Sequence, residues 1–247
     1  MGRLDQIWRH PIKSHGREAI GSVLLEAGKT MPGDRVWAIR HEASTATNDA
    51  WSPCANFSRG SKAPGLMAIN ATYDEAAQTV ELTHPNRPPL TIKPDDNPPE
   101  FFDWIAPIMP ADRAASAEIL RVPGCGMTDS DFPSISLINL SSHRAVAQKL
   151  GRDISAKRWR CNLWLDGLAP WEEFEWIGRT LRIGEAELQV KERILRCMAT
   201  TASTRTGKRD ADTLGALNGG WDHQDFGVYA QVTKPGRIAT GDTVQLL

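Results

Sequence analysis

The sequence predicts a mixed α+β chain that is mainly β and is built from two β-rich parts. Short runs of alternating apolar and polar residues recur along all 247 residues, with turn-forming residues between them. Few segments carry the apolar spacing of a helix, and those that do are short. The proline-rich run at residues 94–99 interrupts the pattern. We therefore expect one domain over residues 1–95 and a second over residues 96–247.

The first part is predicted to consist of strands joined by turns. Residues 3–8 alternate, and a basic loop that contains Lys13 and Ser14 follows them. A Pro-Gly-Asp turn then leads into residues 35–40, whose alternate positions face opposite sides of a strand. The remaining strands of this part are expected at residues 19–25, 65–71, 78–83 and 90–92.

The second part is predicted to add three short helical segments to a further set of strands. Ser141 is expected to cap one of the helices. A hairpin is expected around Gly184, which supplies the turn. The helical segments are residues 100–109, 141–150 and 210–217, and the strands are residues 118–122, 134–138, 158–165, 181–183, 186–191, 226–232 and 241–246.

Composition and charge argue against several classes of function. The net charge is -1, so we expect no binding to nucleic acid or to a membrane surface. The four cysteines are far apart and form no C-x-x-C pair, which argues against a structural zinc site and a disulfide scaffold. A reducing cytoplasm is the expected location. Motifs of serine hydrolases, P-loop proteins and dinucleotide-binding folds are absent from the sequence.

Residues 196–207 carry the most distinctive chemistry of the chain. Cys197 follows an arginine, and several hydroxyl residues, Arg205 and a glycine come after it. A nearby cation lowers the pKa of a thiol, and the thiolate binds soft metal centres. Hydroxyls, backbone N–H groups and an arginine can hold a phosphate. A cofactor carrying both a metal and a phosphate would use both features. The alternative is that Cys197 is a small buried apolar residue.

Residues 158–162 form a second informative stretch. Alternation along a strand places Arg158, Arg160 and Asn162 on one face and Cys161 on the other. Two arginines and an amide on one face make a surface that binds anions. A solvated strand face is the alternative interpretation.

Motifs from both parts, taken in order, resemble one known family. In the second part they are Arg158–Asn162, Arg196-Cys197-x-x-Thr-Thr, Phe226-Gly227-x-Tyr229 and Pro235-Gly236-x-Ile238-x-x-Gly241-Asp242. This set resembles the MOSC domain, the C-terminal module of molybdenum cofactor sulfurases. The first part, through His10–Ser14 and Gly33-Asp34-Arg35-x-Trp37, resembles the β-barrel domain that precedes it in the mitochondrial amidoxime-reducing component and its bacterial relatives. The resemblance implies a β-barrel-like N-terminal domain followed by a β-rich MOSC domain with a few short helices.

The resemblance also implies a molybdenum–molybdopterin cofactor. Cys197 matches the family's metal ligand, which makes it the expected catalytic residue. The family's contacts to the pterin phosphate match Lys13, Ser14, Arg35, Arg160 and Asn162, with Tyr229 near the pocket. Because they lie close to Cys197 in the sequence, Thr200 and Arg205 are added to this set. Each residue has a structural alternative: a solvated charge, a turn cap, a core position or a loop-shaping role. We expect Lys13, Arg35 and Cys197 to face one cleft between the two parts.

The function implied by the resemblance is that of a molybdenum-dependent oxidoreductase that reduces N-hydroxylated or other N-oxygenated small molecules. Some bacterial relatives continue into an iron–sulfur domain with clustered cysteines, and this sequence has no such cluster. Electrons are therefore expected from a separate donor protein of the ferredoxin or cytochrome type, with its reductase. The alternative is a sulfur or molybdenum cofactor carrier, in which Cys197 holds a persulfide or passes the cofactor on. Cys161 stands where the family usually has proline, and its strand face is expected to keep it from the metal.

Overall fold

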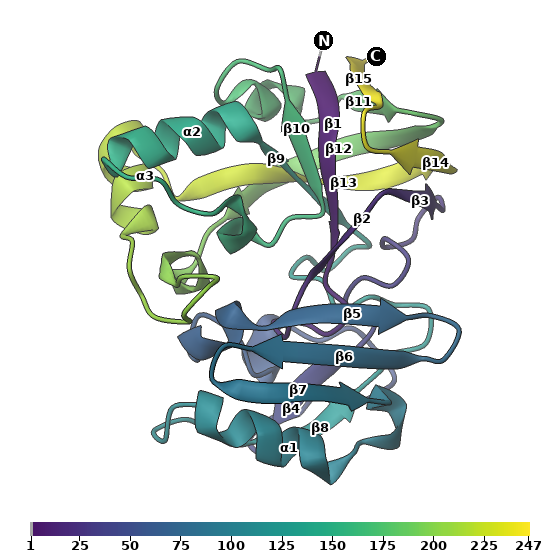
Figure 1. Cartoon of the computed structure of the whole chain (residues 1–247). Helices are drawn as coiled ribbons and strands as arrows, with labels where there is room; N and C mark the ends of the chain where they lie inside the picture. The colour runs from purple at the N-terminus through teal and green to yellow at the C-terminus, as the bar shows by residue number, and fades with distance from the viewer. Residues whose placement is uncertain (1) are drawn as a thin grey trace.

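The computed structural model describes residues 2–247 and consists of two β-rich lobes, one above the other in Figure 1. The upper lobe contains the longest strands and two helices, and the lower lobe contains a three-stranded sheet and one helix. Across residues 2–247 there are three α-helices and fifteen strands. The expected fold class, mixed α+β and mainly β, is confirmed.

Seven strands within residues 2–247 close into a barrel in the upper lobe. β9 and β10 run parallel, and every other neighbouring pair is antiparallel. Closing the sheet pairs its two edges with each other, which removes the exposed edges of an open sheet. In order around the barrel the strands are β1 (Gly2–Arg9), β10 (Leu163–Asp166), β9 (Ile135–Asn139), β13 (Asp225–Lys234), β12 (Ala186–Leu195), β11 (Thr180–Ile183) and β15 (Thr243–Leu246), which pairs with β1 again.

The barrel interior is filled by the apolar positions of alternating strands. On β12, Ala186, Leu188 and Val190 are buried, and the residues between them are partly exposed. On β11, Leu181 and Ile183 are buried in the same core. Successive side chains of a strand point to opposite faces, so this alternation directs one apolar face inward. Removing that face from water is the main favourable contribution to the stability of the barrel.

Two helices cover one side of the barrel (Figure 1). α2 (Leu140–Lys149) begins directly after β9, and its N-cap is Asn139, whose side chain accepts a hydrogen bond from the Ser141 N–H at 2.9 Å. The expected cap at Ser141 is therefore wrong by two residues. α3 (Thr213–Trp221) is capped by Asp212 and packs against α2. Of the helices in residues 2–247, none is long and apolar enough to cross a membrane.

The lower lobe is a small antiparallel sheet with a helix and a strand pair packed around one apolar core. Its largest fully buried side chain is Trp37, whose indole N–H donates to Asp95 at 2.6 Å. The sheet consists of β5 (Asn70–Asp74), β6 (Thr79–His84) and β7 (Arg87–Ile92), the helix is α1 (Pro99–Ile105), and the strand pair is β4 (Ala38–His41) with β8 (Ser116–Leu120).

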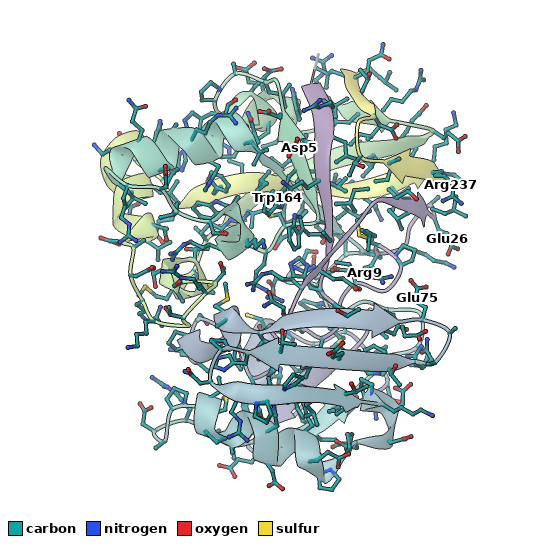
Figure 2. The ribbon with its side chains drawn as sticks, in the orientation of Figure 1. Asp5, Arg9, Glu26, Glu75, Trp164 and Arg237 are labelled. Carbon is teal, nitrogen blue, oxygen red and sulfur yellow. The ribbon has the colours of Figure 1, made fainter. Side chains whose placement is uncertain are left out.

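Strand pairing crosses the predicted domain boundary at residues 95 and 96. β1 completes the barrel of the upper lobe and also pairs with β2 (Glu18–Ile20). β3 (Ser22–Leu25) pairs with β14 (Gly236–Ala239) beside the barrel. Arg9 of β1 reaches Glu75 of the lower lobe, as Figure 2 shows. The two lobes are thus joined by several segments, and the division at residues 95 and 96 stays a prediction.

Most of the expected elements are present, and two of the expected strands are wrong. The strand at residues 65–71 is wrong, because residues 64–68 form a 3₁₀ turn that starts at Pro64, whose ring fixes φ and removes an N–H. Residues 158–162 are not a strand: a 3₁₀ turn, Ala156–Trp159, precedes Arg160, whose φ is +50°.

Candidate functional site

A cavity of about 490 Å³ is lined by residues of both lobes. The loops of the first 67 residues form one wall, and the ends of barrel strands with the turns that follow them form the other. The residues that we expected at the cofactor site and that line this cavity are Lys13, Ser14, Arg35, Arg160, Cys197, Thr200 and Tyr229.

Cys197 lies just beyond the end of β12, where the chain enters a 3₁₀ turn (Met198–Thr201). The Thr200 hydroxyl donates to the Cys197 carbonyl at 3.1 Å, which fixes this turn. The cysteine is exposed, and its neighbours Leu195 and Met198 are 73% and 44% exposed. The thiol is therefore an accessible sulfur at the cavity wall, with an apolar rim beside it.

Arg196 is buried and holds the barrel side of the cavity together. Its Nη1 donates to the Trp159 carbonyl at 2.8 Å, and its Nε donates to the Phe226 carbonyl at 2.7 Å. Its Nη2 lies 3.1 Å from the Cys161 sulfur. The guanidinium thus joins β13 to the loop before β10, and its contact with a thiol is to Cys161 and not to Cys197.

Lys13 is fully engaged with one loop. Its Nζ donates to the Asp129 carboxylate at 2.5 Å and to the carbonyls of Met127 and Thr128 at 2.7 and 3.1 Å. Burial alone would raise the pKa of Asp129, but Lys13 and the nearby arginines, Arg35 first, lower it to about 2. The Asp129 carboxylate is thus the counter-ion of the cationic cluster.

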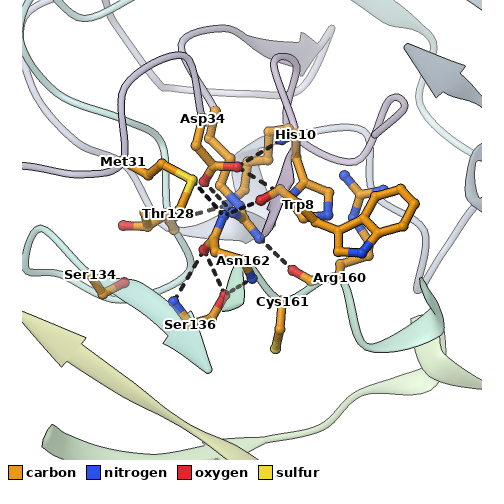
Figure 3. A network of polar contacts seen from close by, with 12 residues as sticks. Trp8, His10, Met31, Asp34, Thr128, Ser134, Ser136, Arg160, Cys161 and Asn162 are labelled. Atoms are coloured by element: carbon orange, nitrogen blue, oxygen red, sulfur yellow. Dashed lines mark hydrogen bonds and ion pairs between the residues drawn. The ribbon is translucent and has the colours of Figure 1, made fainter. Parts of the chain in front are cut away.

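Arg35 is held in place by a buried carboxylate. Its Nη1 donates to Asp34, which also accepts a hydrogen bond from the His10 backbone N–H at 2.8 Å (Figure 3). Burial would raise the pKa of Asp34, but Arg35 and His10 hold it below its usual range. Burial also opposes the charge of Arg35, but Asp34 and Asp129 raise its pKa. Arg35 therefore stays charged, and its Nη2 donates to the Arg160 carbonyl at 3.0 Å.

Arg160 is the cation of this cluster with unused hydrogen-bonding capacity. Its Nη2 donates to the Gly16 carbonyl at 3.2 Å, whereas its buried Nη1 has no partner within residues 2–247. Burial, with Arg35 and Arg17 nearby, lowers the pKa of Arg160 to about 9, so it remains protonated at neutral pH. A buried donor left unpaired costs about 1–3 kcal/mol. This geometry fits a phosphate or another anionic group bound in the cavity.

Comparison with known families identifies both halves of the chain. Residues 1–104 match the MOSC N-terminal beta barrel domain, and residues 128–245 match the MOSC domain. The chain belongs to the MOSC family. This family is linked to the molybdenum cofactor. The resemblance seen in the sequence is therefore confirmed at the level of the family.

Individual relatives of this MOSC chain are distant. A molybdenum cofactor sulfurase of Drosophila grimshawi is 29% identical over 164 residues, which cover 60% of this chain and 20% of that protein. The chain thus spans about one fifth of the length of this curated relative. YuaD of Bacillus subtilis shares the fold, with a TM-score of 0.50 and 13% identity over 100% of this chain and 96% of that chain. YiiM of Geobacillus stearothermophilus is 21% identical, covers 46% of this chain and 53% of that chain, and has a TM-score of 0.36.

Two residues that the MOSC resemblance or their position suggested do not line the cavity. The Asn162 side chain accepts from the Ser136 hydroxyl at 2.7 Å and donates to the Trp8 carbonyl at 3.2 Å, as Figure 3 shows. It therefore ties β9 and β1 to the loop that carries the cavity arginine. Arg205 is exposed on the turn after Ser203, whose hydroxyl accepts its backbone N–H at 3.2 Å. Direct contacts of Asn162 and Arg205 with a cofactor stay predictions.

The cavity wall of this MOSC chain also contains side chains that the sequence argument did not place there. Cys161 was expected on the opposite strand face, and it lines the cavity because residues 159–162 do not form a strand. Asp129 belongs to a run of polar residues, 128–131, that precedes β9. This run indicates a loop, but it does not show that the loop reaches the cavity. Further unexpected side chains with ionisable groups are Cys54, Arg59, Glu192 and Arg193.

Proposed function

We propose that this chain binds a molybdenum–pterin cofactor in the 490 Å³ cavity and reduces N-hydroxylated or other N-oxygenated small molecules. The observation that carries the proposal is the Arg160 Nη1, a buried cationic donor without a partner in residues 2–247, in the same cavity as the Cys197 thiol. One group that bears a phosphate and a thiophilic metal satisfies both features. The membership in a family linked to the molybdenum cofactor supports the same choice.

The residues present fit such a group by their chemistry. Arg160, Arg35 and Lys13 supply positive charge, and the Ser14 and Thr200 hydroxyls lie in the same wall. The Cys197 thiolate is the metal ligand in this proposal. When bound, the cofactor supplies the two-electron reduction that breaks an N–O bond, forms N–H and, with two protons, releases water. The electrons come from a separate donor protein of the ferredoxin or cytochrome type.

Tyr229 is proposed as a neutral hydrogen-bond donor of this site. Burial raises the pKa of Tyr229, and the neighbouring Asp129 carboxylate raises it further. The phenol therefore keeps its proton at neutral pH and can donate to a ligand oxygen. On β13 it stands opposite Glu192 of β12, so the pairing of two long strands fixes its position.

A second candidate function is a carrier of sulfur or of the cofactor. The exposed thiol of Cys197, between the exposed side chains of Leu195 and Met198, favours it. A persulfide has to be reached by the acceptor protein, and this thiol is accessible. In that function the purified protein holds labile sulfur and little molybdenum.

The proposal is tested on protein purified from a host grown with sufficient molybdate. Wild-type protein should contain molybdenum and reduce benzamidoxime with reduced methyl viologen as artificial electron donor. Cys197→Ser should lose the metal or the activity, because a hydroxyl is a harder and far less acidic ligand than a thiol. Cys125→Ser, which changes a thiol outside the cavity, should keep both. Undiminished molybdenum and activity in Cys197→Ser would contradict the proposal, and labile sulfur without molybdenum in wild-type protein would favour the carrier.

A further inference from the structure

Seven cationic side chains line the cavity, and their partners within residues 2–247 differ. Four have a carboxylate within 4.0 Å, and Arg196 uses its donors on backbone carbonyls and a sulfur. The remaining two, Arg59 and Arg160, have no carboxylate partner in the described chain. The four paired cations are Lys13, Arg35, Arg158 and Arg193. Three cations of the cavity thus have no carboxylate partner in residues 2–247, but the donors of Arg196 are already used, so only Arg59 and Arg160 of these three retain free donors.

Arg59 stands on the wall opposite the barrel, in the loop that precedes the 3₁₀ turn of the lower lobe. Its Nη1 donates to the Cys54 sulfur at 3.0 Å, and this is its one side-chain hydrogen bond in the described chain. Its carbonyl accepts the backbone N–H groups of Lys62 and Ala63 at 3.0 and 2.9 Å, which makes a tight turn. The backbone of the partly buried Arg59 is therefore held by a tight turn, and its guanidinium retains donors that have no partner in residues 2–247.

This turn lies beside the residues that follow Cys197. A Cβ at Gly60 would lie 3.5 Å from the Ala199 side chain, so the two loops are in contact. Arg209 joins them, because it donates to the Ser61 carbonyl at 2.7 Å and also to the Met198 carbonyl. Arg59 is consequently placed next to the Cys197 turn, in the cavity that Arg160 also lines.

We propose that Arg59 forms a second anion subsite, which takes a carboxylate of the substrate. A guanidinium binds a carboxylate through two parallel hydrogen bonds, and Arg59 has free donors for them. In this proposal the cofactor anion binds to Arg160, with the charges of Lys13 and Arg35 beside it. The assignment of this carboxylate to a substrate rests on the proposed reductase function. Substrates that carry a carboxylate away from the N–O bond are then preferred over neutral ones.

The subsite itself is tested without the cofactor, by calorimetric titration of the full cofactor-free chain with inorganic phosphate at low salt. Wild-type protein should bind at two sites. Arg59→Gln should lose one site, Arg160→Gln should lose the other, and Arg59→Lys should retain both. Lys62→Gln is the matched control, because this cation borders a separate hollow that Arg59 also borders. It should bind phosphate as wild type does.

Two results of this titration would overturn the subsite. The first is that Arg59→Gln still binds phosphate at two sites, while its midpoint of thermal unfolding equals that of wild-type protein. The second is that Lys62→Gln loses one phosphate site, as Arg59→Gln does. Cys54→Ala removes the partner sulfur of Arg59 and should keep both sites, because the free donors, and not the sulfur contact, bind the anion. If Arg59→Gln does not fold, Arg59→Met, which keeps the aliphatic stem without the charge, takes its place and should lose the second site, whereas retention of that site by Arg59→Met would overturn the proposal.

The substrate class is tested on molybdenum-loaded protein with benzamidoxime and its 4-carboxylate. We expect wild-type protein to prefer the carboxylate in kcat/KM by about tenfold, the effect of one charge-assisted contact. Arg59→Gln should abolish this preference, and Arg59→Lys and Lys62→Gln should keep most of it. Equal kcat/KM values for the two compounds in wild-type protein would refute the substrate assignment. If wild type reduces neither compound, the proposed function fails, and the phosphate titration still decides the subsite.

Discussion

Acidification should destabilise this chain, because two histidines of the segment that carries Lys13 are buried in the neutral form. His10 is 1% exposed and His15 is fully buried. Burial, with Arg160 nearby, lowers the pKa of His10 to about 3, although Asp34 opposes this. Burial also lowers the pKa of His15 to about 4, against its hydrogen bond to the Lys13 carbonyl at 2.7 Å. In the unfolded chain both imidazoles have a pKa of about 6.5.

The size of the effect follows from these pKa values. Between about pH 6.5 and the folded-state values, the unfolded chain binds more protons, so the free energy of unfolding falls as the pH falls. One proton corresponds to about 1.4 kcal/mol per pH unit, so each histidine costs about 2 kcal/mol between pH 6.5 and pH 5. The two together cost about 4 kcal/mol, out of a total stability of about 5–15 kcal/mol. Asp34, whose pKa is lowered, loses its contribution only below about pH 4 and lies outside this range.

The assay is urea unfolding followed by tryptophan fluorescence at pH 8 and at pH 5. Wild-type protein should lose about 4 kcal/mol between the two conditions. His15→Asn keeps an N–H near the position of Nδ1 and does not titrate, so it should lose only about 2 kcal/mol. His41→Asn, in a strand of the lower lobe, serves as the control and should show the full loss. Equal free energies of unfolding at both pH values in wild-type protein would refute the argument that these histidines are buried and neutral.

Three further variants test neighbouring contacts. Gly227→Ala, at a φ of +76°, would drive a methyl group against a carbonyl of β9, so urea unfolding should show a loss of about 2 kcal/mol or more. Asp210→Asn leaves the buried Arg158 guanidinium without a carboxylate that lies 2.6 Å away, and should cost about 2 kcal/mol in the same measurement. Asp129→Asn removes negative charge from the cavity, so calorimetry should show about tenfold tighter phosphate binding, whereas Asp131→Asn on the same loop should change it less than twofold. Unchanged stability in either of the first two variants, or weaker phosphate binding in the third, would contradict the contact concerned.

Much of the fold was predictable because its strands are specified locally. The hairpin of β11 and β12 was expected from alternation and from the turn at Gly184, whose φ is +54° in the structure. The positions of β6, β9 and β13 followed from similar apolar runs. These patterns depend on neighbouring residues alone, and so a single sequence is sufficient to read them.

The closure of the barrel was not predictable in the same way. β1 pairs with β10 and β15, which lie more than 150 residues further along the chain. No periodicity along β1 shows which strands it will meet, since that choice depends on the packing of the whole core. The wrong strand at residues 158–162 has a similar cause. Arg160 takes a left-handed conformation, and Asn162 is held by bonds to Ser136 and Trp8 from distant strands.

The candidate site shows the same limit at the level of charge. Lys13 and Arg35 were expected at an anion site without the Asp129 carboxylate, which lines the same cavity, because Lys13 and Asp129 are 116 residues apart in the sequence. Asp129 compensates part of the positive charge that Arg35 and Arg160 share, which lets these cations lie together without a ligand. An incoming phosphate has to compete with this carboxylate for the Lys13 ammonium. The affinity of the cavity for anions therefore depends on how easily the loop around Asp129 moves aside, as well as on the number of cations in its wall.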